Sequence, residues 1–273
     1  MDALFLSQEI PIRAGAFAGV FAAMALWELA AARRPLQQSK ARRWANNLSL
    51  TLLNTLAVRV IFPAAAVGAA EFAAARGTGF FNAVDVAPPL AFVVSLVALD
   101  LAIWLQHRLF HAVPLLWRLH RVHHADLDFD VTTGARFHPL EILLSMLIKF
   151  AVVIATGAPA AAVLVFEVLL NATSMFNHGN VRLPAGVDRL LRLIIVTPDM
   201  HRVHHSIDPR ETNSNFGFNL AWWDRLFGTY RAQPAAGHDA MTIGIGQFRD
   251  ARELRLDRML LQPFRGGHEP PSV

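Results

Sequence analysis

Twelve histidines occur in this chain, and eight of them fall in three short patterns. The pattern HRLFH occurs once and HRVHH occurs twice, and together they hold His107, His111, His120, His123, His124, His201, His204 and His205. On an α-helix, residues three and four positions apart share a face, with Cβ atoms about 5–6 Å apart. Each pattern would therefore aim several imidazoles at one point. Because clustered imidazoles are costly to desolvate and repel one another when protonated, the arrangement predicts a bound cation.

The composition narrows the kind of metal site. Cysteine is absent, which excludes disulfides, iron–sulfur clusters and thiolate zinc sites. Eight or more ring nitrogens exceed the coordination sphere of one ion, so we expect two ions with open positions. Imidazole binds zinc, copper, iron and nickel alike, and ligand type does not choose among them. Because the HExxH pattern of many zinc hydrolases is absent, we favour a redox pair of irons, with zinc as a substitute in purified protein.

The elements that must position these histidines are membrane helices. The 273 residues are 54% hydrophobic and only 17% charged, with a mean hydropathy of +0.35, as in membrane proteins. The net charge of +4 is modest, and basic residues alternate with acids after residue 180, so no nucleic-acid partner is expected. The first apolar run ends in basic residues rather than at a cleavage site. We interpret it as a retained anchor.

Apolar runs long enough to span a bilayer number four or five. They cover about 13–31, 48–69, 89–110, 140–158 and 160–180. The second is the least secure, because Arg59 and Pro63 interrupt it, and whether it spans fully stays open. The last two are separated by a short turn and should form an antiparallel hairpin. We therefore expect an all-α, polytopic membrane bundle with a cytoplasmic helical cap that carries a histidine-rich dimetal site.

Charge predicts the orientation of the bundle. The loop after the first run contains five basic residues and no acid: Arg33, Arg34, Lys40, Arg42 and Arg43. The positive-inside rule places this loop in the cytoplasm. Counting crossings from there brings every histidine pattern to the same cytoplasmic side. The sequence predicts an integral protein of the bacterial inner membrane, with 1–88 as N-terminal membrane helices, 89–264 as a catalytic domain and 265–273 as a polar tail.

Longer motifs resemble a known superfamily. HRVHHADLDFDVTTGARFHPLE, FNHGN, TPDMHRVHHS and NSNFGFNLAWWDRLFGTY are similar to motifs of the fatty acid hydroxylase/sterol desaturase superfamily, in its bacterial sterol-desaturase-like branch. The resemblance covers about 100–264 and, weakly, the N-terminal helices. It implies a membrane di-iron oxidoreductase of lipid biosynthesis that hydroxylates or desaturates a lipid C–H bond. Such enzymes use dioxygen and electrons from a separate donor, here a ferredoxin, a cytochrome b5-like protein or a reductase.

The resemblance also implies the metal ligands, which double as the catalytic residues. They are His107, His111, His120, His123, His124, His178, His201, His204 and His205. Some relatives carry another histidine one turn before the position of His178, where this chain has Ser174. The second ion would then be one ligand short, and water, His138 or an amide of Asn177 or Asn180 would complete its coordination.

Several acids and one histidine are candidates for roles around the ligands. Asp100 lies on the same helix face as His107 and His111, and a carboxylate often accepts from the second N–H of a metal-bound histidine; the alternative is a helix-contact role. Asp199 precedes the second HRVHH and is another such carboxylate. For His138 we leave ligand, supporting and structural roles open. Glu167, Asn171 and Ser174 form a polar stripe, which could serve the site or only link helices.

Two other functions were weighed. A zinc-dependent membrane hydrolase would need a carboxylate near the metal, and Glu141 and Asp199 are the nearby acids. A metal transporter or sensor would place its ligands near the bilayer midplane, whereas these patterns gather at one surface. The lipid class (fatty acyl, sterol-like or other isoprenoid) and the choice between hydroxylation and desaturation are left open.

Overall fold

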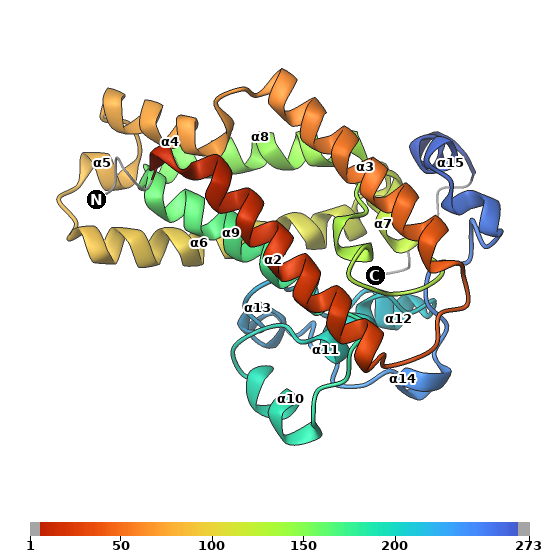
Figure 1. Ribbon diagram of the computed structural model, residues 1–273. Coiled ribbons are helices and arrows are strands. Elements are labelled where there is room, and N and C mark those ends of the chain that lie inside the picture. Colours follow the sequence, from red (N-terminus) through yellow and green to blue (C-terminus); the bar gives the residue numbers. More distant parts are fainter. Residues whose placement is uncertain (1–5, 267–273) are drawn as a thin grey trace.

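The computed structural model describes residues 6–266, and over these residues the fold is all-helical, with three isolated β-bridges and no strand (Figure 1). Five helical stretches are long and apolar enough to cross a membrane: Glu9–Ala30, Lys40–Ala83, Pro88–Ala112, Pro139–Thr156 and Ala160–Asn177. Large apolar side chains such as Leu26 and Leu29 point outward from them. The expected all-α membrane bundle is confirmed.

Helix α9 (Ala160–Asn177) forms the centre of the bundle. It packs against α2 (Glu9–Ala30), α4 (Ala65–Arg76) and α6 (Pro88–Ala112), and α8 (Pro139–Thr156) lies beside α3 (Lys40–Ile61), α4 and α6. The α8–α9 hairpin turns at Gly157, which has a φ of +67°. A Cβ at Gly157 would lie 2.8 Å from the Asn82 amide, so the turn needs glycine for both its conformation and its space. The expected short turn between the two apolar helices is therefore present, and an ion pair between Lys149 of α8 and Glu167 of α9 joins them.

The second apolar run differs from the expected single helix over 48–69. Helix α3 ends at Ile61, the chain turns through 62–64, and α4 begins at Ala65. Pro63 has no N–H, and its ring excludes the preceding turn of a continuous helix, which explains the break. Helices α4 and α5 (Phe80–Ala83) lie at the end of the bundle away from α7 and α11 (Figure 1).

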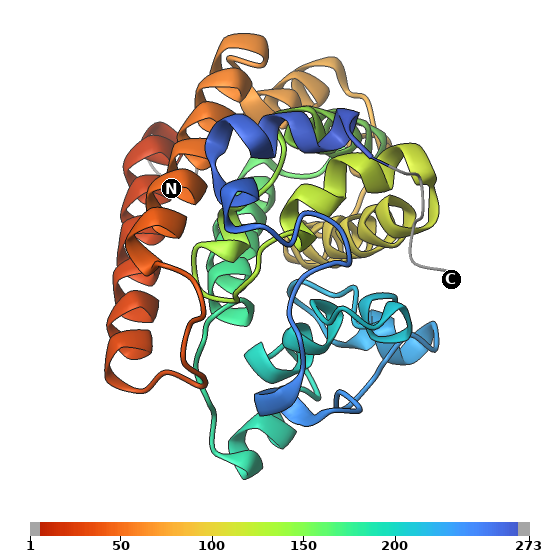
Figure 2. The ribbon, with the colours of Figure 1, turned by 90° about the vertical axis from the view of Figure 1, so that its right-hand side faces the viewer.

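A cap of short helices covers the other end of the bundle. Its members are α7 (Pro114–His124), α10 (Ala185–Leu191), α11 (Pro198–His204), α12 (Pro209–Thr212), α13 (Trp222–Leu226), α14 (Gly237–Ala240) and α15 (Leu256–Leu261). Figure 2 shows the blue C-terminal segment leaving the cap and crossing back over the bundle. There α15 packs on α3, and the Leu256 N–H donates to Asn46 Oδ1 at 2.8 Å. The C-terminal segment thus fastens the cap to the membrane helices.

A buried ionic network joins the start of α3 to the segment after α7. Arg43 donates to Asp126 at 2.8 and 2.9 Å and to Asp130 at 2.5 Å, and all three side chains are fully buried. Arg136 Nε donates to the Val122 carbonyl at 2.8 Å. Leaving such buried charges unpaired costs several kcal/mol, on the order of 3–5, so the network fixes α7 against the bundle.

Candidate metal centre

Nine buried histidines converge where α6, α7, α9 and α11 meet. They form a five-histidine group, His107, His111, His120, His124 and His204, and a four-histidine group, His123, His178, His201 and His205. Within each group, the nitrogens that can bind a metal lie within 4.8 Å of one another. The structure therefore brings together the nine predicted ligands, including His178, whose position the sequence patterns alone did not single out.

The two HRVHH copies are interleaved between the groups. In the first copy, His120 and His124 join the five-histidine group and His123 joins the other. In the second copy the division is reversed, because the outer pair at i and i+4 joins the four-histidine group while His204 joins the five-histidine group. Each pattern therefore serves two adjacent centres. This explains why three histidines are needed at i, i+3 and i+4, rather than two.

Local helix geometry sets this arrangement. Helix α6 ends at Ala112 after delivering His107 and His111, and α7 restarts at Pro114, whose fixed φ suits the first helical position. The break turns α7 so that its histidines face those of α6. His111 Nε2 and His124 Nε2 lie 3.1 Å apart across the break.

The five-histidine group has the donor set that a cation requires. His107 Nδ1 donates to the Phe216 carbonyl and His204 Nδ1 to the Ser214 carbonyl, each at 2.7 Å. Because a carbonyl oxygen only accepts, each ring carries its hydrogen on Nδ1. The Nε2 atom of each neutral ring therefore carries a lone pair. Those two Nε2 atoms lie 3.0 Å apart. Facing lone pairs at this distance need a cation between them.

A proton does not satisfy this need at neutral pH. Burial, and then the neighbouring His107 and His120, hold the pKa of His204 well below its usual value. A metal ion that accepts both lone pairs removes the repulsion without protonating either ring. The chemistry of the donor set therefore fits a divalent metal.

The four-histidine group is built around His178. Its Nδ1 donates to the Ser174 carbonyl at 2.7 Å, so its Nε2 is a lone pair, which lies 3.1 Å from Nε2 of both His123 and His201. Burial lowers the pKa of His178 to about 3, which keeps this ring neutral. The same argument thus assigns a second cation site, directly beside the first.

One carboxylate supports the five-histidine group. His120 Nδ1 and Glu141 Oε1 are hydrogen-bonded at 2.6 Å, and both side chains are nearly fully buried. Carboxylate–histidine–metal arrangements of this kind fix the ring and make the ligand nitrogen more basic. From the sequence, Glu141 is expected only as a possible acid of a hydrolase. Its position in the first turn of α8, within the FHPLE motif, was the signal for this role.

The region that contains all nine histidines matches a known family. The fatty acid hydroxylase family profile matches residues 92–229, which is half of the chain. The chain belongs to the fatty acid hydroxylase family. It is 33% identical over 184 residues to the ornithine lipid hydroxylase OlsE of Rhizobium tropici, covering 61% of this chain and 55% of that protein. No solved structure shows a significant match.

Other relatives of this fatty acid hydroxylase family member are more distant. Human alkylglycerol monooxygenase is 29% identical over 150 residues, covering 53% of this chain and 32% of the relative. The fatty acid hydroxylase vlmA of a Lecanicillium species is 29% identical over 155 residues, covering 51% and 42%. The chain thus spans between about a third and about half of the length of these curated relatives. Together with its five apolar spans, family membership identifies it as an integral membrane protein.

Asp100 does not contact the histidines of this family member as expected. Its carboxylate accepts from Asn219 Nδ2 at 2.7 Å, from Trp223 Nε1 at 2.8 Å and from the Leu220 N–H at 3.3 Å. An acid on an apolar helix needs partners, and the 219–223 segment supplies them. Asp100 therefore anchors the cap to α6, and the carboxylate that meets a histidine is Glu141.

Asp199 and His138 also lie outside the two groups. Asp199 pairs with Arg202 and lies 3.5 Å from Arg33 and 3.8 Å from His238. His138 is the N-cap of α8: its Nδ1 accepts from the Leu140 N–H at 3.2 Å, and its Nε2 lies 3.3 Å from the Leu260 carbonyl. Of the three roles left open for His138, these contacts fit the structural one.

The polar residues near His178 have separate partners. Ser174 Oγ donates to the Gly134 carbonyl at 2.9 Å, and Asn180 exchanges hydrogen bonds with the Arg34 backbone. Asn177 Nδ2 donates to the Phe218 carbonyl at 2.9 Å, while its buried Oδ1 has no hydrogen-bond partner within residues 6–266. Of the amides expected as substitute ligands, Asn177 is thus the one with a free oxygen beside the four-histidine group.

The remaining polar stripe of α9 links helices. Glu167 forms ion pairs with Arg13 of α2 and Lys149 of α8. Asn171 donates to the Glu167 carbonyl at 2.9 Å. The helix-linking interpretation matches the contacts of Glu167, whereas the bond of Asn171 stays within α9.

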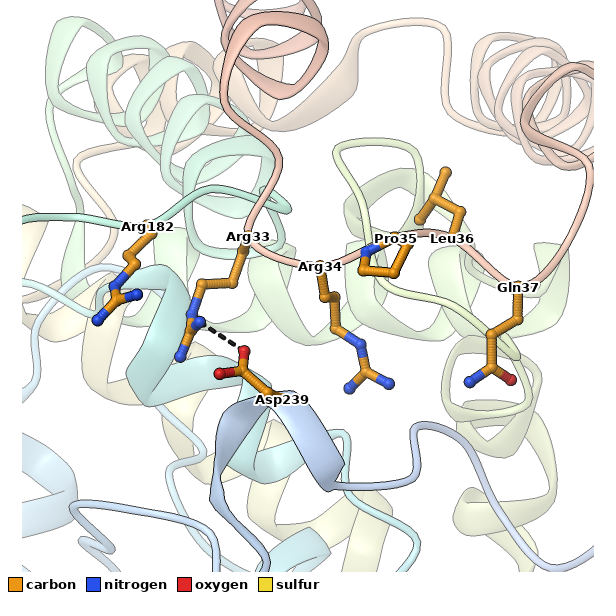
Figure 3. Close-up of a pocket in the computed structure, with 7 residues that line it drawn as sticks. All are labelled: Arg33, Arg34, Pro35, Leu36, Gln37, Arg182 and Asp239. Atoms are coloured by element: carbon orange, nitrogen blue, oxygen red, sulfur yellow. Dashed lines mark hydrogen bonds and ion pairs between the residues drawn. The ribbon is translucent and has the colours of Figure 1, made fainter.

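A surface pocket lies apart from the histidines. Figure 3 shows it along the loop after α2, with its lining residues Arg33, Arg34, Pro35, Leu36, Gln37, Arg182 and Asp239. Arg33 pairs with Asp239 at 2.6 Å, and Arg34 donates to the Met241 carbonyl at 2.9 Å. Two of its arginines belong to the basic loop that predicts orientation, and here they fasten the loop to α14 and the segment after it.

Proposed function

We propose that this protein is a di-iron lipid hydroxylase that inserts oxygen at a C–H bond of a membrane lipid. The observation that carries the proposal is the pair of adjacent, all-histidine groups whose Nε2 lone pairs face one another at 3.0–3.2 Å. Two irons bound there would supply dioxygen activation. The names of the relatives, which are hydroxylases and monooxygenases, support hydroxylation over desaturation.

The chain's own residues would hold the ions and keep the site dry. Each of the nine histidines is at most 2% exposed, so their ring nitrogens are shielded from bulk water. The carbonyls of Ser174, Ser214 and Phe216 fix three rings with their hydrogens on Nδ1, and Glu141 holds the ring of His120 in place. Fixed ligands in a low-dielectric site need little reorganisation during the reaction.

The substrate would enter from the bilayer, because His107 and His111 lie on the apolar span α6 and His178 directly follows the apolar span α9. We propose further that the site faces the cytoplasm of a bacterial inner membrane, as the basic loop predicts, and that a ferredoxin, a cytochrome b5-like protein or a reductase supplies electrons. Dioxygen is the cosubstrate.

Two contacts argue against the hydrolase alternative. Glu141 lies behind the His120 ring, on the side of Nδ1, rather than beside a metal-bound water. Asp199 is already paired with Arg202. Neither acid considered for hydrolysis therefore has the position of a base.

Lipid mass spectrometry tests the proposal. The protein, purified without oxygen, loaded with ferrous iron and reconstituted with lipid and a chemical reductant, should add the mass of one oxygen atom to a lipid when air is admitted. His204→Ala should abolish the product. His138→Asn is the matched control, because asparagine also serves as an N-cap and the variant should keep activity. Turnover that needs neither oxygen nor reductant would contradict the proposal.

A further inference from the structure

The cap of the described chain carries a largely exposed apolar surface. We define the cap patch as Val187, Leu190, Leu193, Ile194, Trp222, Leu226 and Phe227, which are between 45% and 69% exposed. Its residues come from α10, the turn after it, and α13 with the following residue, none of which belongs to a membrane span. Soluble surfaces rarely gather so many large apolar side chains, so the patch calls for an occupant.

The cap patch is one rigid surface rather than two loops. Trp222 Nε1 donates to the Leu193 carbonyl at 3.0 Å, and Arg225 Nη2 donates to the Arg192 carbonyl at 2.6 Å. The Ala221 N–H donates to the Ile194 carbonyl at 3.0 Å. These bonds hold α13 against the turn after α10, so their apolar side chains are presented together.

Direct contacts attach the cap patch to a membrane-spanning helix. The Phe227 ring stacks on Trp104 of α6 with centroids 4.6 Å apart, and Trp104 Nε1 donates to Asp224 at 3.0 Å. Trp223 reaches Asp100, also on α6. Figure 1 shows α13 at the cap end of the molecule, with α10 further along the cap.

The depth of these contacts places the patch at membrane level. Asp100 and Trp104 precede the end of α6 by twelve and eight residues, or about 18 and 12 Å at ~1.5 Å per residue. Leu105 and Leu109 on this same part of α6 are 50% and 44% exposed, as expected of side chains that face lipid. A segment packed on this part of α6 lies beside lipid too.

The charges around the patch match an anionic lipid surface. Arg189 and Arg225 lie on the two helices of the patch and are exposed. The two acids in 185–194 and 222–227 are not available to repel phosphate, because Asp188 pairs with Arg192 and Asp224 is fully buried. An apolar surface bordered by arginine is typical of elements that lie in the membrane interface.

We propose that the cap patch is seated in the lipid leaflet on the histidine side, so that the cap is a membrane-inserted element and not a solvent-exposed lid. The occupant is the bilayer itself, with its acyl chains against Leu226 and Leu190 and its phosphates near the arginines. This inference does not depend on iron or on turnover, and its test can fail while the proposed hydroxylase function stands.

The absence of cysteine makes the test direct. Single-cysteine variants Leu190→Cys and Leu226→Cys, in the full-length protein reconstituted in phosphatidylcholine/phosphatidylglycerol vesicles, would carry a nitroxide spin label. Leu105→Cys on α6 is the lipid-facing reference, and Arg252→Cys, whose native side chain is 82% exposed, is the aqueous reference. The measurement is the ratio of collision rates with oxygen, which partitions into lipid, and with a polar nickel chelate, which does not.

We expect both cap labels to give the same ratio of oxygen to nickel-chelate collision rates as the Leu105 label. A ratio equal to that of the Arg252 label would overturn the proposal, because the patch would then face water. Protection from both reagents would overturn it as well, because a protein surface such as a second copy would then be the occupant. If either variant fails to bind metal like the parent protein, Leu193→Cys and Ile194→Cys provide a second pair on the same patch.

Discussion

The two histidine groups differ in how their rings are held. In the five-histidine group, the Nδ1 atoms of His107, His120 and His204 each have a hydrogen-bond partner, whereas those of His111 and His124 are buried with none within residues 6–266. In the four-histidine group only His178 has such a partner. The Nδ1 atoms of His123, His201 and His205 are buried without a hydrogen-bond partner within residues 6–266.

This difference indicates that one centre is ordered before an ion arrives and that the other depends on the ion for its order. Ligands fixed by outer hydrogen bonds bind metal more tightly, since less freedom is lost on binding. We therefore expect the five-histidine group to retain its ion longer than the four-histidine group, and the predictions below test or remove this asymmetry.

The largest effect is expected from Glu141→Ala. It removes the carboxylate that holds His120 and should lower metal affinity at the five-histidine group by about 10–100-fold. Affinity at the four-histidine group should change little. Competition with a graded series of chelators measures the metal affinity of each histidine group. Equal losses at the two groups would argue that Glu141 acts on overall folding instead.

A smaller effect is expected from Asp224→Asn. Asp224 accepts from the backbone N–H groups of Phe216 and Gly217 at 2.8 and 2.9 Å and thereby positions the carbonyl that receives His107 Nδ1. Asparagine can accept only at its oxygen, so one or two hydrogen bonds of about 1 kcal/mol each are lost. We predict that the ion bound by the five-histidine group is released roughly tenfold faster. Stopped-flow mixing with a chelator measures this rate. An unchanged rate would exclude this positioning role.

Acid should destabilise the metal-free protein. Burial holds the pKa values of His178, His204 and His205 below normal, so the folded chain binds fewer protons than the unfolded chain, whose histidines titrate near pH 6.5. Stability from these groups is present above about pH 6.5 and is lost as the pH falls below it. The midpoint temperature of thermal unfolding of the metal-free protein in detergent should therefore be lower at pH 5 than at pH 7. A midpoint that rises on acidification would contradict neutral rings.

The smallest effect is expected from Ser174→Ala. The hydroxyl donates to the Gly134 carbonyl, but the acceptor for His178 is the backbone carbonyl of residue 174, which alanine keeps. The variant should lose about 0.5–1.5 kcal/mol of stability and retain both ions. Thermal unfolding and metal analysis on one sample measure the two quantities. Loss of the ion from the four-histidine group would show that the Ser174 hydroxyl itself supports that group.

Much of the architecture follows from local sequence rules. Hydrophobic length predicted the membrane helices and the hairpin at Gly157, and the i, i+3 and i+4 spacing predicted that the histidines converge. The spacing does not predict how the histidine rings divide between the two groups. The same helix periodicity is compatible with more than one division. The division depends on the angle between α6 and α7 at 112–114, which is a tertiary feature.

The errors have physical reasons as well. Pro63 ends a helix that hydropathy alone extends to residue 69, because hydropathy does not register a missing N–H. Asp100 was assigned to the histidines from its helix face, but the partners on that face come from the 219–223 segment, more than a hundred residues later. The sequence names Glu141 only as an acid for a hydrolase, because its contact with His120 crosses from α8 to α7. The polar tail, apart from 265–266, lies outside the described residues.

The number of metal ions that each group holds tests the account most directly. Iron would be counted per chain, after anaerobic loading and desalting, in the parent protein and in His204→Ala and His205→Ala. The account predicts two ions per chain in the parent, and one in each variant, with the ion left in His205→Ala released more slowly than the ion left in His204→Ala. A single ion in the parent, or no ion retained by either variant, would contradict two separate histidine centres.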